Sequence, residues 1–160
     1  MSAHSDQQRV EYLERAIGLA VRNVSEGGGP FGAVVVTADG RVHEGVNRVT
    51  RDNDPTAHAE VVAIRRAAAE SGNFDLSGAV LYASCEPCPL CLSATLWARI
   101  GRVYFAADRH GAARAGFDDA LFYEYFSGER PELLPVEHSP LASADSPFDA
   151  WRSNAGRTDY

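Results

Sequence analysis

Cysteine and long apolar stretches are scarce in this chain. Its 160 residues include only 3 cysteines, Cys85, Cys88 and Cys91, and no apolar run approaches the roughly 18 residues that a membrane-spanning helix needs. Cysteines so close together are poorly placed for disulfides but well placed for a metal ion, which favours a reducing compartment. We therefore expect a cytoplasmic protein with no membrane partner. The polar residues 1–8 also lack the apolar core of a signal peptide.

Positive charge is also in short supply. Lys and Arg together number 15 against 22 Asp and Glu, so the formal net charge is −7. A protein that grips a phosphate backbone usually shows a basic surface. The acidic balance therefore argues against a nucleic-acid partner, although a local basic patch is compatible with it. A small uncharged ligand fits this charge better than RNA or DNA.

Internal repeats and low-complexity segments are absent, and the length fits a single domain, residues 1–160, with a proper core. Apolar periodicity predicts helices at 7–26, 57–71, 89–98, 118–127 and 147–155, and strands at 31–37, 41–49, 79–84, 103–107 and 133–137. Residues 38–40 read as a hairpin turn, and Thr56 can cap the second helix after the polar loop 50–55. The alternation of strands and helices predicts an α/β fold whose mixed sheet has helices on both faces.

One pair of short motifs indicates chemistry. His58-Ala59-Glu60 is followed about thirty residues later by Pro87-Cys88-Pro89-Leu90-Cys91. One imidazole and two thiolates can hold a tetrahedral zinc ion and leave the fourth position free for water. Glu60 is then placed to move protons without binding the metal. This order, H-x-E and then P-C-x-x-C, is typical of zinc deaminases that act on nucleobases.

The predicted helices explain why these residues suit a catalytic zinc site. His58 and Glu60 fall at the start of one helix, and Cys88 and Cys91 at the start of another. The partial positive charge of two converging helix N-termini favours thiolate and carboxylate. Zinc with two thiolates and a neutral imidazole is formally neutral, and its bound water reaches a pKa of about 7 in good cases. Glu60 can take that proton, pass it to a base nitrogen and then protonate the departing amine.

Two alternatives stay open at this point. Cys85-x-x-Cys88 is a second, overlapping C-x-x-C, and a site of three cysteines and one histidine would close the coordination shell and abolish catalysis. We expect Cys85 to end a strand and to point away from the helix turn of the other two. A chance cluster without metal, or a Glu60 that is only a solvated helix carboxylate, are the remaining simple interpretations.

The chain resembles the cytidine deaminase-like superfamily and, within it, is most similar to the bacterial-type guanine deaminases. The resemblance is carried by residues 28–33, 53–60, 84–91, 115–119 and 146–152. The first three stretches are common to many deaminases and indicate the chemistry. The last two, Ala-Gly-Phe-Asp-Asp and Ser-Pro-Phe-Asp-Ala-Trp-Arg, narrow the resemblance toward guanine. Arg114 and residues 128–143 carry no motif that ties to the family.

The resemblance implies a three-layer α/β/α sandwich with a mixed five-stranded sheet, one zinc ion and a homodimer. It also implies that a C-terminal segment of about residues 140–160 is exchanged between subunits and closes the partner's active site. Asp119 would bind the amino edge of the base and share in proton transfer. Tyr160 would come from the exchanged tail.

The remaining substrate contacts are also implied by the resemblance. Asn47 would hydrogen-bond the base, Phe31 would stack near it, Trp97 would shape the pocket and Ala59 would contact the substrate. Each has a simpler interpretation: Asn47 as a turn residue after a strand, and Phe31 and Trp97 as core aromatics. Asp119 has one as well, because a carboxylate at a helix start interacts favourably with the helix dipole.

The leading functional hypothesis is hydrolysis of guanine to xanthine and ammonia. A carboxylate such as Asp119 can accept from the N1–H and the 2-amino group of guanine, whereas adenine offers an N1 acceptor and a C2–H. Guanosine, cytosine or an aminated triazine are alternative substrates. A tRNA adenosine deaminase shares the His58 motif but is disfavoured by the −7 charge. The hypothesis from another class is a zinc-stabilised module without activity.

Overall fold

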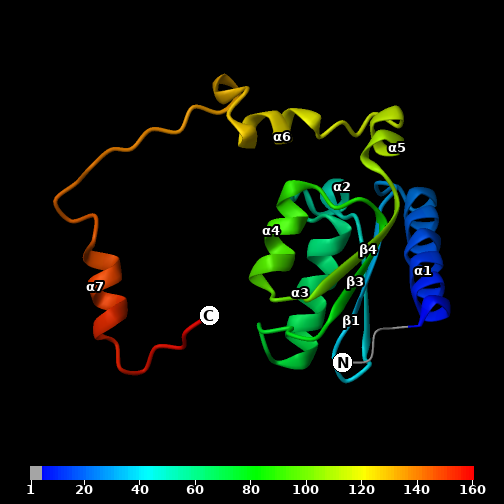
Figure 1. The fold of residues 1–160 in the computed structure, drawn as a ribbon, viewed down its shortest axis with the longest axis horizontal. Coiled ribbons are helices and arrows are strands. Elements are labelled where there is room, and N and C mark those ends of the chain that lie inside the picture. Colours follow the sequence, from blue (N-terminus) through cyan, green and yellow to red (C-terminus); the bar gives the residue numbers. More distant parts are fainter. Residues whose placement is uncertain (1–4) are drawn as a thin grey trace.

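The computed structural model describes residues 5–160 and has a four-stranded mixed sheet at its centre (Figure 1). The strands are β1 Gly32–Val36, β2 Val42–Val46, β3 Val80–Cys85 and β4 Arg102–Ala107, in the order β2-β1-β3-β4. Strand β1 is antiparallel to β2 and β3, and β3 is parallel to β4. The predicted α/β class and mixed sheet are confirmed. Residues 1–4, half of the polar N-terminal stretch, lie outside the described residues.

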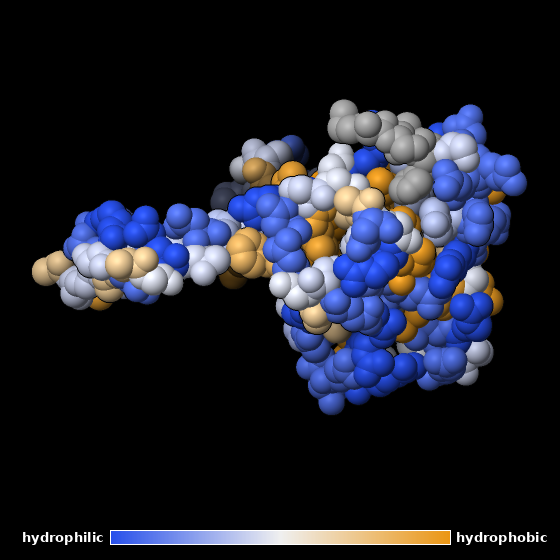
Figure 2. Space-filling model, turned by 90° about the horizontal axis from the view of Figure 1, so that it is seen from below, coloured by the Kyte–Doolittle hydropathy of each residue, from blue (hydrophilic) through white to orange (hydrophobic). Residues whose placement is uncertain are grey.

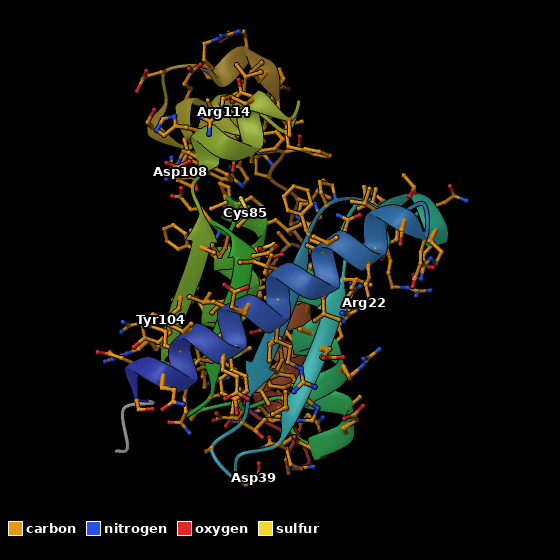
Figure 3. The ribbon with its side chains drawn as sticks, turned by 90° about the vertical axis from the view of Figure 1, so that its right-hand side faces the viewer. Arg22, Asp39, Cys85, Tyr104, Asp108 and Arg114 are labelled. Atoms are coloured by element: carbon orange, nitrogen blue, oxygen red, sulfur yellow. The ribbon has the colours of Figure 1, made fainter. Side chains whose placement is uncertain are left out.

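Helices cover both faces of this sheet. Helix α1, Asp6–Ser25, lies on one face, and α3, Ala59–Ser71, lies on the other, with α4, Pro89–Trp97, beside it (Figures 1 and 3). Strand β1 is buried on both sides, and its side chains alternate between two cores: Val34 and Val36 pack under α1, Ala33 and Val35 under α3. This two-sided burial explains why β1 is an unbroken run of small and branched apolar residues.

Two glycines let the helices approach the sheet closely. A Cβ on Gly32 would lie 2.3 Å from the carbonyl oxygen of Ala16 in α1, and one on Gly45 would lie 2.2 Å from that of Ala59 in α3. No side chain fits at such distances, so these positions require glycine. The contact at Gly45 seats the first turn of α3 directly on β2, which fixes the place of the adjoining His58.

The connections agree with the prediction at the first hairpin and differ from it in the loop after β2. The hairpin turn at 38–40 is confirmed, with Gly40 at φ +84°. The loop after β2 contains a short helix, α2 Val49–Asp52, and α3 begins at Ala59 with His58 at its N-cap. The predicted capping role of Thr56 is therefore wrong. Its hydroxyl donates to Asp54 Oδ1 at 2.7 Å instead, within a tight turn before the helix.

The predicted fifth strand at 133–137 is wrong, and so is the five-stranded sheet. The structure has a 3-10 helix, η1 Pro131–Leu133, and no strand between it and α7, Ser146–Ser153. The side chains of Leu134 and Val136 are exposed, and Pro135 has no N–H to donate to a ladder. The apolar pattern was real, but within residues 5–160 no strand is paired with the outer edge of β4.

Beyond β4 the chain leaves the layered body. Helix α5, Arg109–Arg114, and helix α6, Ala120–Ser127, cross one end of the sheet, and the chain then runs outward to α7 (Figure 1). We call residues 120–160 the C-terminal arm. Figure 2 shows its far part standing away from the body as a separate lobe. Its end turns back, so that the Tyr160 ring lies 6.2 Å from Trp97 and 6.4 Å from Phe74 between centroids.

Within residues 5–160, no helix combines the length and the apolar character that crossing a membrane requires.

Candidate active site

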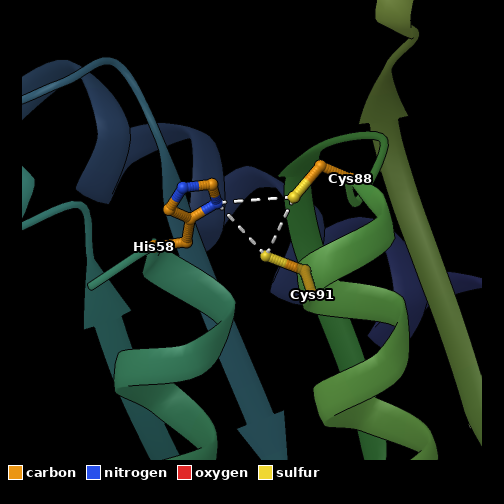
Figure 4. A group of neighbouring side chains, drawn as sticks. All are labelled: His58, Cys88 and Cys91. Atoms are coloured by element: carbon orange, nitrogen blue, oxygen red, sulfur yellow. Dashed lines mark hydrogen bonds between the residues drawn. The ribbon is translucent and has the colours of Figure 1, made fainter. Parts of the chain in front are cut away.

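Three side chains from two helix starts meet at one point (Figure 4). His58 is the N-cap of α3, Cys88 is the N-cap of α4, and Cys91 lies in the first turn of α4. The Nδ1 atom of His58 lies 3.5 Å from the sulfur of Cys88 and 3.5 Å from that of Cys91, and the two sulfurs are 3.7 Å apart. The predicted positions at the starts of two converging helices are confirmed.

The triangle formed by these three atoms has the size that zinc requires. Zn–S bonds of about 2.3 Å and a Zn–N bond of about 2.0–2.1 Å at tetrahedral angles place two sulfurs about 3.8 Å apart, and nitrogen about 3.6 Å from sulfur. The edges of 3.7 and 3.5 Å match both separations. Three protein donors leave one tetrahedral position for a water or a substrate atom, as in catalytic rather than structural zinc sites.

Cys85 takes no part in this cluster. It ends β3, and its sulfur lies 3.7 Å from the carbonyl oxygen of Asp108, at the start of α5 (Figure 3). The same side chain lines an apolar cavity of about 400 Å³ between α1 and α5, together with Phe31 and Phe117. Burial raises the pKa of the Cys85 thiol, which therefore stays protonated. The described residues thus present three metal ligands, and the site with a third cysteine is not formed.

The two ligand thiols shift each other's pKa in opposite directions. The hydrogen bond between the two sulfurs is the main cause that lowers the pKa of Cys88 to about 4 and raises that of Cys91. The His58 ring also stabilises the Cys88 thiolate, and the N-terminus of α4 adds its partial positive charge. A thiolate is therefore ready to bind a cation, and zinc displaces the remaining thiol proton.

Glu60 is buried beside the three ligands. It is the second residue of α3 and is only 8% exposed, so the interpretation as a solvated helix carboxylate is wrong. Burial, followed by the negative charge of Cys88, raises the pKa of Glu60. A carboxyl group with a raised pKa carries a proton more readily at neutral pH, which is what a proton shuttle requires.

Phe31, Asn47 and Ala59 lie on the elements that frame this site. Asn47 follows β2 directly, its backbone N–H donates to the Phe31 carbonyl at 3.1 Å, and its Oδ1 accepts from the Val49 N–H at 3.2 Å. Ala59 is fully buried between His58 and Glu60 at the start of α3. The Phe31 ring meets the Phe117 ring edge-on at 4.9 Å. The structure brings these residues together, and their contacts with a substrate stay predictions.

One supporting residue was missed by the sequence analysis. Asn23 is buried in α1, and its Nδ2 donates to the carbonyls of Gly29 and Asn47, both at 2.8 Å. It thereby ties the loop before Phe31 to the loop after β2. Gly28 makes room for it, because a Cβ there would lie 2.3 Å from Asn23 Nδ2. An asparagine on the apolar face of α1, just before a glycine run, was the available signal.

The Asp119 side chain does not cap its own helix. Asp119 is the N-cap residue of α6 but makes no capping bond with its side chain, and the Ala120 N–H instead donates to Asp118 Oδ1 at 3.0 Å. Partial burial raises the pKa of Asp119, and the charges of Cys88 and Arg109 also act on it. Its carboxylate therefore feels the charge of a metal ligand and is free of a capping bond.

Trp97 and Tyr160 lie apart from the three ligands within one chain. Trp97 ends α4, six residues after Cys91, which is a rise of about 9 Å along the helix. Its side chain is 68% exposed and contacts Tyr160 from the arm. Their roles at the substrate pocket stay predictions.

An α/β fold that joins one histidine and two cysteines at two helix starts, with a buried glutamate beside them, defines the class of zinc-dependent deaminases. The chain belongs to the cytidine and deoxycytidylate deaminase zinc-binding family, whose model matches residues 6–107. The matched residues run from the start of α1 to the end of β4, so they coincide with the layered body and contain all three ligands.

The chain is similar to several deaminases. Guanine deaminase of Bacillus subtilis (strain 168) is 47% identical over 151 residues, which are 93% of this chain and 97% of that protein. The X-ray structure of guanine deaminase from Bacillus subtilis has a TM-score of 0.90 at 46% identity and covers 99% of both chains. A tRNA-specific adenosine deaminase of Agrobacterium fabrum is 37% identical over 143 residues, 87% of this chain and 89% of that protein. Guanine deaminase from Nitrosomonas europaea has a TM-score of 0.64 at 30% identity over 68% and 63% of the two chains.

Proposed function

We propose that this deaminase converts guanine and water to xanthine and ammonia. The observation that carries the substrate assignment is the similarity to guanine deaminase of Bacillus subtilis along 93% of the chain. That similarity extends past the metal-binding body into the arm, because the structural match to the Bacillus subtilis enzyme covers 99% of both chains. The site geometry supports the reaction class, and the arm supports the choice of base.

The protein's own groups would handle the protons. Zinc held by His58, Cys88 and Cys91 would supply an acidic water, with a pKa of about 7 in favourable sites. Glu60 accepts the proton of that water and delivers it to a ring nitrogen of the base. Glu60 then takes the second proton, from the hydroxyl group that the base has gained, and passes it to the departing amine, so that one buried carboxyl group serves successive transfers. Its raised pKa suits this exchange near neutral pH.

Recognition of the base would come from the residues around Glu60. Asp119 accepts hydrogen bonds from the N1–H and 2-amino group of guanine and takes part in proton transfer. Asn47 binds the base edge, Phe31 stacks on the ring, and Ala59 packs against it at the start of α3. A base without the donors would leave Asp119 buried and unpaired, which such a site rejects strongly.

We further propose that residues 1–160 act as one deaminase domain in a homodimer, in which about residues 140–160 are exchanged. The arm exposes large apolar side chains that one chain leaves uncovered, including Phe126, Val136 and Phe148. Trp97 and Tyr160 are together yet remote from their own ligands, so the pocket they line would belong to the second copy. A tail closing the partner's site would also exclude water. The three free thiols fit a cytoplasmic location.

The second candidate is deamination of adenosine in tRNA. The observation in its favour is the 37% identity to the Agrobacterium fabrum enzyme over most of both chains. The net charge of −7 stands against it, because a tRNA backbone calls for a basic surface.

The deciding experiment measures ammonia release from guanine, guanosine, deoxyguanosine, cytosine, cytidine, adenine and ammeline, and from a tRNA with adenosine at the wobble position. The Glu60→Gln variant serves as the blank for contaminating activity. We expect guanine to give the highest kcat/KM. Preference for a base without a 2-amino group would remove the guanine assignment and leave the deaminase class intact. Zinc-loaded protein without turnover on any member would favour a non-enzymatic module.

A further inference from the structure

We propose that Arg109 is a positioning residue, which holds Asp119 beside the metal site by joining Glu86 to Tyr123. The inference rests on the function proposed above for Asp119. Arg109 opens α5, Glu86 lies in the loop between β3 and α4, and Tyr123 lies in α6. One side chain thereby connects the metal-ligand loop to the helix that carries Asp119.

The first contact is with the loop that leads into the metal ligands. The Arg109 guanidinium donates to Glu86 Oε1 through Nη2 at 2.6 Å and through Nε at 3.1 Å, and its backbone N–H donates to Oε2 at 2.9 Å. The Glu86 N–H donates in turn to the Ala107 carbonyl at 2.8 Å. Glu86 is two residues before Cys88, and its side chain is only 19% exposed. Such charge-assisted, part-buried bonds are stronger and more directional than a surface ion pair.

The second contact is with α6. The Arg109 guanidinium carbon lies 3.9 Å from the centre of the Tyr123 ring, well within the range of a cation–π contact. Tyr123 is four residues after Asp119, the N-cap residue of α6, so it lies about one helical turn beyond it. Fixing the Tyr123 ring therefore fixes the first turn of α6, at whose start Asp119 lies.

Asp119 needs such an external support. Its side chain makes no capping bond, and α6 lies outside the layered body with no buried residue of its own. The edge-on contact of Phe117 with Phe31 anchors the segment just before α6. The Arg109 clamp anchors the helix itself, one turn after Asp119. Together they set the distance between Asp119 and the metal-ligand loop.

The test compares Arg109→Gln with Arg114→Gln, an exposed arginine at the other end of the same short helix. Both changes remove one positive charge from α5. We expect Arg109→Gln to keep zinc and the melting temperature near wild type and to lower kcat/KM about 10- to 100-fold, whereas Arg114→Gln stays within about twofold. Equal values for the two variants would contradict the proposal.

A double-mutant cycle with Asp119→Ala separates positioning from a general structural role. If Arg109 acts through Asp119, Arg109→Gln should cost little further activity once Asp119 is already absent. Full additivity of the two changes would show that Arg109 acts by another route and would overturn the inference. Tyr123→Leu should reproduce part of the loss, and Tyr123→Phe, which keeps the ring, should lose less.

Amide hydrogen exchange over residues 120–127 reports on the clamp without any turnover. We expect faster exchange in Arg109→Gln than in Arg114→Gln, because α6 loses its attachment. Unchanged exchange would contradict the clamp even if guanine is the substrate. The kinetic comparison uses whichever base of the panel reacts fastest, so a failure of guanine removes the proposed substrate and leaves the Arg109 test in force.

Discussion

The layered body and the C-terminal arm differ in how far they bury their side chains. In the body, residues 6–107, side chains alternate into two cores, and the ligands His58, Cys88 and Cys91 lie at the starts of α3, which packs on the sheet, and of α4, which packs beside α3. In the arm, residues 120–160, no residue is buried, and large apolar side chains face outward. The family model matches the body alone, whereas the resemblance to guanine deaminase of Bacillus subtilis continues through the arm.

On the function proposed above, this difference separates the chemistry, which the body supplies, from the choice of base, to which the arm contributes. A zinc site needs donors held to within tenths of an ångström, and only a packed core with short helix starts provides that. Choice of base needs a few contacts around the reacting atom, and these can come from a segment that the body does not hold rigidly. Asp119 stands at the border between the two regions, where α6 begins.

The largest effect is expected from the metal ligands. Cys88→Ser should lose zinc and nearly all deaminase activity, because two protein donors cannot hold the ion firmly. Cys85→Ser is the matched control three residues away, and it should keep zinc near one per chain, since its sulfur faces the Asp108 carbonyl. Metal analysis of both purified variants measures this. Zinc lost by Cys85→Ser but retained by Cys88→Ser would reverse the assignment.

The next effect is expected from Glu60. Glu60→Gln should retain zinc and the fold yet lose about 10² to 10⁴-fold in kcat, because acid–base catalysis of the attack and of amine departure both depend on it. The measurement is steady-state kinetics together with zinc content and melting temperature. A variant that keeps more than about a tenth of wild-type turnover would exclude the proton shuttle.

Truncating the arm should act on activity and spare the body. Deleting residues 156–160 is expected to lower kcat/KM about tenfold or more, equivalent to about 1.4 kcal/mol or more of transition-state binding, without loss of zinc or of the main melting transition. Tyr160→Ala should account for much of the loss, and Thr158→Ala is its control. Sedimentation of wild type tests the dimer directly. Full activity of the truncated chain would refute closure of the site by the tail.

The smallest effect is expected from replacing the buried asparagine of α1, with an exposed asparagine of the arm as its control. Asn23→Ala should lower the free energy of unfolding by about 1–3 kcal/mol, because two backbone carbonyls at the site lose their donor. Asn154→Ala, an exposed position in the arm, should stay within about 0.5 kcal/mol. Urea unfolding of the two variants makes the comparison. Equal losses would mean that the arm is packed more tightly in solution than in a single chain.

Local sequence pattern was sufficient to predict the metal site and the strands of the body. The spacing of His58 to Glu60 and of Cys88 to Cys91 predicted two helix starts around one zinc ion, because side chains within one turn of a helix have little choice of direction. The alternating burial of β1 and the hairpin turn at Gly40 were equally readable. Glycine runs, helix starts and apolar periodicity are short-range signals, and each agrees with the fold around it.

Only the tertiary structure decided the rest. Residues 133–137 have a strand-like pattern, yet a strand exists only where a partner edge accepts its hydrogen bonds, and none does here. The two carbonyls that Asn23 holds and the clamp of Arg109 between Glu86 and Tyr123 depend on contacts between segments distant in sequence. The sequence by itself therefore determined the three metal ligands and the glutamate beside them. Long-range packing, which no local spacing encodes, decided where the arm lies and which side chains support the site.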